Sequence, residues 1–163
     1  MRKFEDIAYN GTCLVYYNGI HKGNCIGYKD REGYMWVRIN GKNKFAHRVI
    51  WELNYGPIPQ GMQIDHINGI RDDNRLVNLR ICTKAENGRN VKRKRNNVSG
   101  YIGVRFKKEN KKWVANIKQN GKQVHLGYFG SAEEAYRARV EAEKKVYGAF
   151  SPHVCRNLSE ELR

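Results

Sequence analysis

Residues 64–87 contain Ile64-Asp65-His66-Ile67-Asn68-Gly69, then Asn74-Arg75-Leu76-Val77-Asn78-Leu79-Arg80, then Thr83-Lys84-Ala85-Glu86-Asn87. Ile64 to His66 predicts a short strand leading into an Asn-Gly turn, and Leu79 to Cys82 predicts a second strand. Thr83 and Glu86 have the spacing of a capping box, in which two side chains satisfy the backbone donors at a helix start. The predicted order is strand, loop, strand and helix.

Asp65, His66 and Asn87 are the residue types of metal-assisted hydrolysis. Asp65 supplies a hard anionic oxygen, which suits Mg²⁺ or Mn²⁺, and Asn87 offers a neutral amide oxygen from the first turns of the helix. His66 has an ordinary pKa near neutrality and can take a proton from water. Adjacent strand residues point to opposite faces, so the strand must bend at its end if Asp65 and His66 are to serve one site.

This stretch resembles the HNH homing endonucleases of the ββα-metal superfamily, in the branch that has Asn in place of the last His. The resemblance implies one divalent metal, Mg²⁺ or Mn²⁺, on Asp65 and Asn87, with His66 as the general base. It implies that Asn78 belongs to the catalytic set, because the matching Asn holds the loop and positions the His. The matching residues are Asp65, His66, Asn68, Gly69, Asp73, Asn74, Asn78, Leu79, Arg80, Thr83, Asn87 and Asn90.

The preceding segment also predicts regular structure. Residues 34–39 alternate and are followed by Asn40-Gly41, the strongest short hairpin signal. Residues 47–54 have helical apolar spacing, and Gly56-Pro57 should end that helix. His47 and Arg48 fit the upstream part of the same HNH branch. We interpret them as candidate phosphate contacts, or for His47 as a structural residue, rather than as catalytic groups.

Composition points to a polyanionic partner. The chain has 163 residues and a formal net charge of +15. No apolar run approaches the roughly 20 residues that span a bilayer, and no secretory signal is visible, so we expect nucleic acid, no membrane and a cytoplasmic location. The four cysteines show no Cys-x-x-Cys spacing, so we expect no structural zinc and reduced thiols. We expect no small-molecule cofactor and a monomer, with dimerisation left open.

The composition changes near Val91. Lys92, Arg93, Lys94 and Arg95 form a run without apolar or acidic residues, which predicts an exposed arm that contacts the DNA backbone. The expected organisation is an HNH nuclease domain over residues 1–90, a basic linker over 91–98, a DNA-binding domain over 99–150 and a tail over 151–163.

The segment after Ser99 predicts three antiparallel strands and one covering helix. Alternating apolar residues mark the strands, and Asn120-Gly121 turns the chain between the last two. Ser131 and Glu134 form a capping box, and Ala135, Ala138, Ala142 and Val146 form the predicted buried stripe of the helix. The fold class is therefore α+β: a ββα-metal domain, then a small sheet with one helix.

This module resembles an AP2-type DNA-binding domain, through Gly100-Tyr101, Gly103-Val104-Arg105, Lys112-Trp113-Val114-Ala115, Leu126-Gly127 and Phe129. Free-standing phage homing endonucleases often combine these two parts in this order. From residue 99 to 130 there are seven Lys or Arg against one Glu, so the sheet carries the positive charge. By strand parity we place Trp113 in the core, expect no clearly exposed aromatic on the outer face, and assign DNA contact to Arg105, Lys107, Lys112, Asn116, Lys118, Gln123 and His125.

Together these patterns predict a metal-dependent endonuclease of duplex DNA. The alternative is a non-catalytic, sequence-specific DNA-binding regulator with a decayed nuclease half. An RNA-binding or RNA-cutting protein is a further rival, which would need exposed aromatics that stack on splayed bases. An architectural protein is a more distant one.

Overall fold

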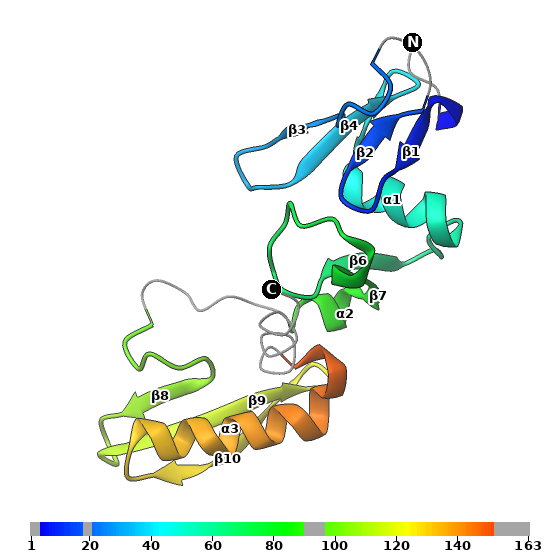
Figure 1. Cartoon of the computed structure of the whole chain (residues 1–163). Helices are drawn as coiled ribbons and strands as arrows, with labels where there is room; N and C mark the ends of the chain where they lie inside the picture. Colours follow the sequence, from blue (N-terminus) through cyan, green and yellow to red (C-terminus); the bar gives the residue numbers. More distant parts are fainter. Residues whose placement is uncertain (1–3, 18–20, 90–96, 152–163) are drawn as a thin grey trace. The chain divides into compact units, whose positions relative to one another are not determined.

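The computed structural model describes residues 4–17, 21–89 and 97–151. The chain forms two compact units, Met1–Asn87 and Gly88–Arg163. Both mix short helices with antiparallel sheet, so the α+β class is confirmed (Figure 1). None of the helices among these residues is long and apolar enough to cross a membrane.

The first unit is built from small antiparallel sheets around one helix. Strands β1 (Ile7–Tyr9) and β2 (Leu14–Tyr16) pair with each other, and β3 (Tyr28–Lys29), β4 (Met35–Ile39) and β5 (Lys42–Phe45) form a sheet in that order. Helix α1 (Ala46–Tyr55) follows, and then β6 (Met62–His66), β7 (Leu79–Thr83) and the short helix α2 (Lys84–Asn87). Strands β6 and β7 pair antiparallel, so the predicted strand, loop, strand, helix order is confirmed.

Two local predictions in this unit are also confirmed. Asn40 and Gly41 have φ of 51° and 75°, the left-handed values that a two-residue hairpin needs, and they join β4 to β5. Helix α1 ends at Gly56, whose φ of 82° suits a residue without a side chain, and the Gly56 N–H closes the last turn on the carbonyl of Glu52.

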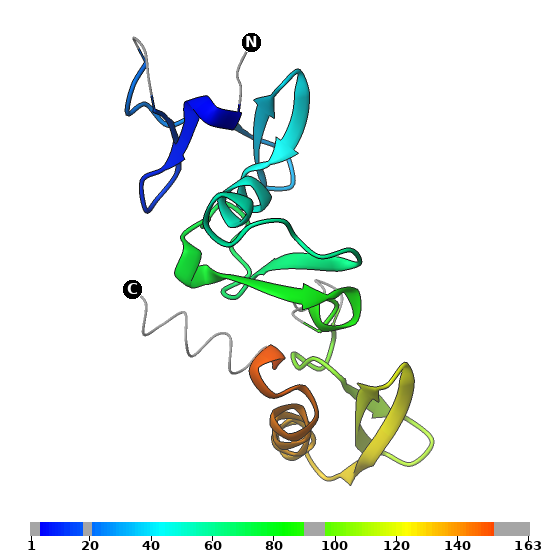
Figure 2. The same cartoon turned by 90° about the vertical axis from the view of Figure 1, so that its right-hand side faces the viewer.

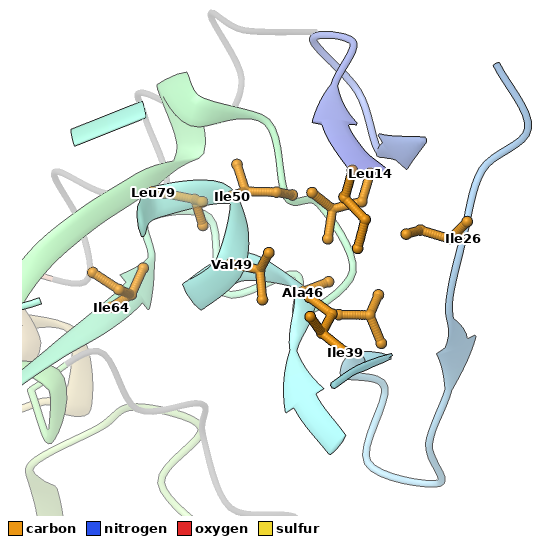
Figure 3. Close-up of a cluster of buried hydrophobic side chains, with 10 residues drawn as sticks. Leu14, Ile26, Ile39, Ala46, Val49, Ile50, Ile64 and Leu79 are labelled. Atoms are coloured by element: carbon orange, nitrogen blue, oxygen red, sulfur yellow. The ribbon is translucent and has the colours of Figure 1, made fainter. Parts of the chain in front are cut away.

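The core of this unit ties α1 to the strands that flank it. Val37, Val49 and Ile50 are fully buried and belong to one core cluster with Ile64 of β6 and Leu79 of β7. Figure 3 shows Val49 and Ile50 of α1 beside Ile64 and Leu79. Ile64 and Leu79 lie directly beside Asp65 and His66 in the hairpin, so the apolar core fixes the strand from which the two polar side chains project.

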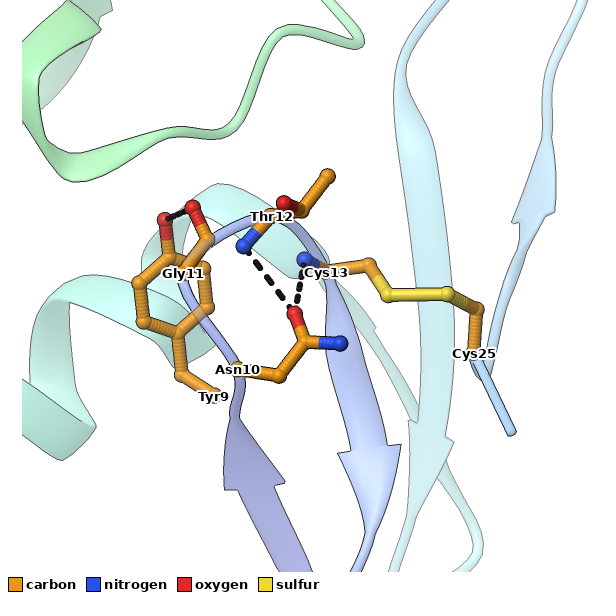
Figure 4. The surroundings of a disulfide bond; sticks show 6 residues. All are labelled: Tyr9, Asn10, Gly11, Thr12, Cys13 and Cys25. Atoms are coloured by element: carbon orange, nitrogen blue, oxygen red, sulfur yellow. Dashed lines mark hydrogen bonds between the residues drawn. A yellow bond between two sulfur atoms is a disulfide. The ribbon is translucent and has the colours of Figure 1, made fainter. Parts of the chain in front are cut away.

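The expectation of reduced cysteines is wrong for two of the four. Cys13 and Cys25 form a disulfide, with Cα atoms 5.9 Å apart (Figure 4). An isolated antiparallel bridge between Val15 and Cys25 brings the segment after β2 back alongside that strand, which puts the two cysteines within bonding distance. The two cysteines are close because of this pairing between separate segments. A search for Cys-x-x-Cys spacing in the sequence could not detect it. Cys82 is a buried free thiol, and Cys155 lies outside the described residues.

The second unit is a three-stranded antiparallel sheet with one helix across it. Strands β8 (Val104–Lys107), β9 (Lys112–Gln119) and β10 (Lys122–Phe129) lie in the order β10-β9-β8. Helix α3 (Ala132–Tyr147) covers one face, as Figures 1 and 2 show from two sides. The Asn120-Gly121 turn has φ of 49° and 80°, and Ser131 accepts a hydrogen bond from the Glu134 N–H at 3.1 Å, so the turn and the helix cap are as predicted.

The buried side of α3 differs from the predicted alanine stripe. Ala135 is buried, but the most buried positions that follow are Arg139, Glu143 and Tyr147, while Ala138, Ala142 and Val146 are only half-buried. Arg139 and Glu143 are tolerated there because they pair with each other, Nη1 to Oε1, at 2.8 Å. A prediction based on hydrophobic residues alone cannot identify two charged residues that become buried by pairing with each other.

Candidate functional site

The candidate site lies at the end of the β6–β7 hairpin. The register pairs Asp65 with Arg80 and His66 with Leu79, and it stays regular up to His66. The side chains of Asp65 and His66 therefore leave opposite faces of β6, and each has its own partners. The bend that we expected at this strand does not fall between them, because the turn begins only after His66.

On one face, Asp65 is held by an arginine. Arg80 donates to Oδ2 of Asp65 from Nη2 at 2.7 Å and from Nε at 3.0 Å, and both side chains are largely buried. Gln63 shares this face of β6, and its Oε1 accepts a hydrogen bond from Nδ2 of Asn87 at 2.9 Å. Asn87 thus reaches the face of Asp65 from helix α2.

Helix α2 is positioned by the predicted capping box. The Thr83 N–H donates to Oε2 of Glu86 at 2.8 Å, and the Glu86 N–H donates to Oγ1 of Thr83 at 3.2 Å. This reciprocal pair starts the helix directly after β7, so Asn87 falls at the end of its single turn.

On the other face, His66 sits among polar and aromatic groups. Its Nε2 lies 2.9 Å from Oδ1 of Asn74, and both residues are buried. The ring of His47 meets that of His66 edge-on, with centroids 4.9 Å apart. Burial lowers the pKa of His66 below its usual value, while the contact with Asn74 and the charge of Asp65 act in the opposite direction. The role of Asn74 was missed by sequence reasoning, which matched it to the HNH pattern but gave it no task.

Asn78 holds the loop between the two strands, as the resemblance implied. Its Oδ1 accepts from the Asn68 N–H at 3.0 Å, and its Nδ2 donates to the carbonyl of Asp73 at 2.7 Å. Arg75 and Asn68 both donate to the Asp73 carboxylate. No direct contact of Asn78 with His66 is among the hydrogen bonds found in the described residues.

His47 is a buried neutral imidazole beside the candidate base. Burial, together with the nearby His66 and Arg48, lowers the pKa of His47 to about 3. Phe45 stacks on its ring at 5.3 Å, and its Nδ1 has no hydrogen-bond partner among the described residues. Arg48 follows it and is half-buried. The structural interpretation of His47 fits this burial, and contact with phosphate stays a prediction.

The oxygen donors of Asp65 and Asn87 fit a hard divalent cation. A carboxylate and an amide oxygen are the ligands that such ions prefer, and a small ligand set leaves positions for water and phosphate. The contact of Asn87 with Gln63 engages the amide nitrogen rather than the oxygen. Across residues 4–17, 21–89 and 97–151, no group of three or more His, Cys, Asp or Glu gathers to hold a metal ion.

The second unit presents a cationic sheet face. The strand register places all seven predicted DNA contacts on one face, opposite α3, and Trp113 on the helix side, packed against the core. The predicted arm from Lys92 to Arg95 lies outside the described residues. Phe106 and Val124 lie on the helix side but remain 47% and 38% exposed, because they lie near strand ends.

The expectation of no exposed aromatic on the sheet face is wrong. Tyr128 is 49% exposed and pairs with Val114, on the same face as the cationic residues. A register shift between His125 and Gly127 reverses the alternation, so simple parity misplaces everything after Leu126. The Tyr128 ring contacts that of His125, with centroids 4.8 Å apart, and the Nζ of Lys107 lies 5.7 Å from its centroid.

Two regions of the chain match known protein families. Residues 44–89 match the model of an HNH endonuclease family, and residues 99–149 match that of the AP2 domain. Protein 3.8 of Escherichia phage T7 is 40% identical over 77 residues, which are 47% of this chain and 64% of that protein. The uncharacterized gene 5.3 protein of Enterobacteria phage T3 is 38% identical over 50 residues, 26% of this chain and 50% of that protein. The match thus spans less than two thirds of either relative, and no solved structure matches.

Proposed function

Because the chain joins an HNH endonuclease region to an AP2 domain, we propose that it is a metal-dependent endonuclease that hydrolyses phosphodiester bonds in duplex DNA. The observation that carries this proposal is the β6–β7–α2 arrangement, which lies within the region matched to the HNH family. It presents a buried carboxylate, a buried imidazole and an amide oxygen from Asp65, His66 and Asn87. Asp65 and His66 leave opposite faces of β6, but the Asp65 carboxylate is near enough for its charge to act on the His66 ring.

In the proposed reaction His66 removes a proton from a water molecule, and the water oxygen attacks phosphorus in line with the leaving 3′ oxygen. Its lowered pKa keeps the imidazole neutral, and therefore able to accept a proton, at neutral pH. Asp65 and Asn87 would hold the metal, Mg²⁺ or Mn²⁺, which supplies stabilisation of the charge on the phosphate and the leaving oxygen. We propose one metal per site and products with 5′-phosphate and 3′-hydroxyl ends.

The AP2 unit would deliver this activity to its substrate. We propose that its cationic sheet face reads the major groove, while the arm from Lys92 to Arg95 contacts phosphates. The division into a nuclease domain, a basic linker and a DNA reader, a homing role and action in the host cytoplasm belong to the same proposal.

Two observations favour rival functions. The close pair between Arg80 and the Asp65 carboxylate suits a decayed nuclease that only binds DNA. The exposed ring of Tyr128 suits stacking on an unpaired base of RNA or single-stranded DNA.

One cleavage assay separates these functions. Purified full-length protein is offered duplex DNA, single-stranded DNA and RNA, each with Mg²⁺ and with EDTA. We expect Mg²⁺-dependent cutting of duplex DNA that is lost in His66→Ala and kept in Glu5→Ala, a change in an exposed carboxylate of the first unit. Binding without any cleavage would support the regulator, and preferred cutting of RNA would support the other rival.

A further inference from the structure

We infer that Asn74 is a positioning residue that fixes the proton of the neutral His66 ring on Nε2 and leaves Nδ1 as the atom that accepts the proton from water. This inference rests on the proposed endonuclease function for its consequence, but its geometry stands by itself. Oδ1 of Asn74 lies 2.9 Å from Nε2 of His66, and each residue is only 5% exposed. An amide oxygen can only accept a hydrogen bond, so Nε2 must donate.

The loop that carries Asn74 is anchored on both sides of it. The Asp73 carboxylate is held by Arg75 and by Nδ2 of Asn68, and the Asp73 carbonyl accepts from Nδ2 of Asn78. On the other side, the short 3₁₀ turn Leu76–Asn78 begins two residues later, and the Asn78 carbonyl accepts from the Ile67 N–H at 2.8 Å. Asn74 therefore has little freedom to withdraw from His66.

This network gives Asn78 an indirect route to the base. Asn78 ties residues 67 and 68, just after β6, to residue 73, just before Asn74. The loop closure that it provides brings the Asn74 side chain to the end of β6, where His66 lies. Asn78 thus orients the loop, and Asn74 orients the imidazole.

The remaining neighbours restrict the rotation of the ring. The His47 ring lies edge-on at 70° to His66, and Tyr34 lies 6.2 Å away, centroid to centroid. The carboxylates of Asp65, Asp72 and Asp73 contribute negative potential at His66. Because Nε2 donates its hydrogen to Asn74, the lone pair that accepts a proton lies on Nδ1. The neighbouring rings hinder a flip of the imidazole that would exchange the two nitrogens.

The test reads the proton position directly, by ¹H–¹⁵N correlation spectra of the histidine rings in full-length protein. The His66 signals are assigned with His66→Gln, and spectra are taken with and without Mg²⁺ at a pH where the ring is neutral. Protonated and unprotonated ring nitrogens have well-separated ¹⁵N shifts. We expect the Nε2–H tautomer in the unaltered protein. The Nδ1–H tautomer would overturn the inference at once, because it would mean that the Asn74 amide donates instead.

Two substitutions at Asn74 separate an acceptor role from mere packing. Asn74→Asp keeps an oxygen acceptor and should retain the Nε2–H tautomer and most of the cleavage rate. Asn74→Leu keeps the volume but removes the acceptor, so it should mix the tautomers and lower kcat by roughly ten- to a hundredfold, with DNA affinity unchanged. Ile70→Ala, a change of an exposed side chain in the same loop that keeps the backbone contacts of residue 70, should leave the tautomer unchanged.

The outcomes also distinguish this inference from the proposed function. If the tautomer depends on Asn74 as described but no nucleic acid is cut, the positioning stands and the endonuclease proposal fails. If the protein cuts DNA and Asn74→Leu, folded by circular dichroism, keeps both a single Nε2–H tautomer and the full rate, the inference about Asn74 fails and the endonuclease proposal stands.

Discussion

Among the described residues, each unit of this protein buries one arginine–carboxylate pair, and the two pairs differ in how they are enclosed. Arg139 and Glu143 lie one helical turn apart on α3, with side chains 7% and 2% exposed. Asp65 and Arg80 come from two strands, and Arg80 keeps 14% of its side chain exposed. The α3 pair is enclosed inside the second unit, where Ser151 also donates to the Glu143 carboxylate, whereas the hairpin pair sits at the edge of a polar site.

The largest expected effect is the loss of DNA cleavage, proposed for the first unit, without loss of DNA affinity, proposed for the second. Asp65→Ala and Asn87→Ala should each abolish cleavage of duplex DNA, since each removes a proposed metal ligand. DNA affinity should stay within about twofold, because phosphate contacts by basic residues supply most of it. Gel-shift titration and a Mg²⁺-dependent cleavage assay measure the two quantities. Full cleavage by either variant would remove the proposed metal site.

The second prediction tests the α3 pair itself. Arg139→Ala should destabilise the second unit by about 3–5 kcal/mol, because it leaves Glu143 buried without its partner. The double change Arg139→Met with Glu143→Leu should cost much less, since no buried charge remains. Amide hydrogen exchange in β9 reports the local free energy of opening.

The matching change in the first unit sharpens the contrast. Arg80→Met should raise the exchange rate of β6 amides far less than Arg139→Ala raises that of β9, because Asp65 lies nearer to water and can recruit a cation. If Arg80→Met raised amide exchange in β6 as much as Arg139→Ala raises it in β9, the two ion pairs would contribute equally to stability and the proposed contrast would be wrong.

The third prediction concerns the exposed ring on the cationic face. Tyr128→Ala should lower affinity for duplex DNA by about tenfold and alter the preference among sequences, because the ring would lose a contact with base edges in the major groove. Phe106→Ala is the matched control, since Phe106 is almost equally exposed but lies on the helix side. Fluorescence anisotropy on a panel of duplexes measures both. If Phe106→Ala were the more damaging change, the assignment of the reading face would be reversed.

The smallest expected effect is the pH dependence of stability from His47. Its folded pKa of about 3 lies below the ordinary value of 6.5, so between these pH values the unfolded chain binds more protons. The contribution is fully present above pH 6.5 and is lost as the pH falls, at no more than about 1.4 kcal/mol per pH unit. The free energy of unfolding, measured by urea titration at several pH values from 7 to 4, should fall less steeply with decreasing pH in His47→Leu than in the unaltered protein. An unchanged slope would mean that His47 titrates normally in the folded state.

Local signals in the sequence predicted most of the elements, because each element is specified by neighbouring residues. The Asn40-Gly41 and Asn120-Gly121 turns, the Thr83 capping box and the end of α1 at Gly56 all follow from residue types a few positions apart. The same holds for the order of β6, β7 and α2, which brought Asp65, His66 and Asn87 into consideration.

What the sequence did not reveal depends on contacts between distant residues or on a shift in register. The Cys13–Cys25 disulfide needs the bridge between Val15 and Cys25, and the Asp65–Arg80 pair needs the β6–β7 register. The buried Arg139–Glu143 pair runs against hydrophobicity, so a search for an apolar stripe passes over it. The contact between Asn74 and His66 depends on how the twelve residues between β6 and β7 close into a loop, which spacing alone does not predict.

The register shift beside Leu126 lets β10 accommodate one extra residue while both halves of the strand stay paired with β9. All residues of β10 before it alternate in one phase, and Gly127, Tyr128 and Phe129 alternate in the other. Loss of the one codon for Leu126 would put His125 and Gly127 in direct succession and restore a single phase through the strand. Every remaining residue would keep its present face, because His125 and Tyr128 already lie on the cationic face and Gly127 lies on the helix side. The deletion would remove only the bulge and the packing of Leu126 against the core. A relative that lacks this residue would carry the same side chains on the same surface, so an alignment should place its one-residue gap at the bulge.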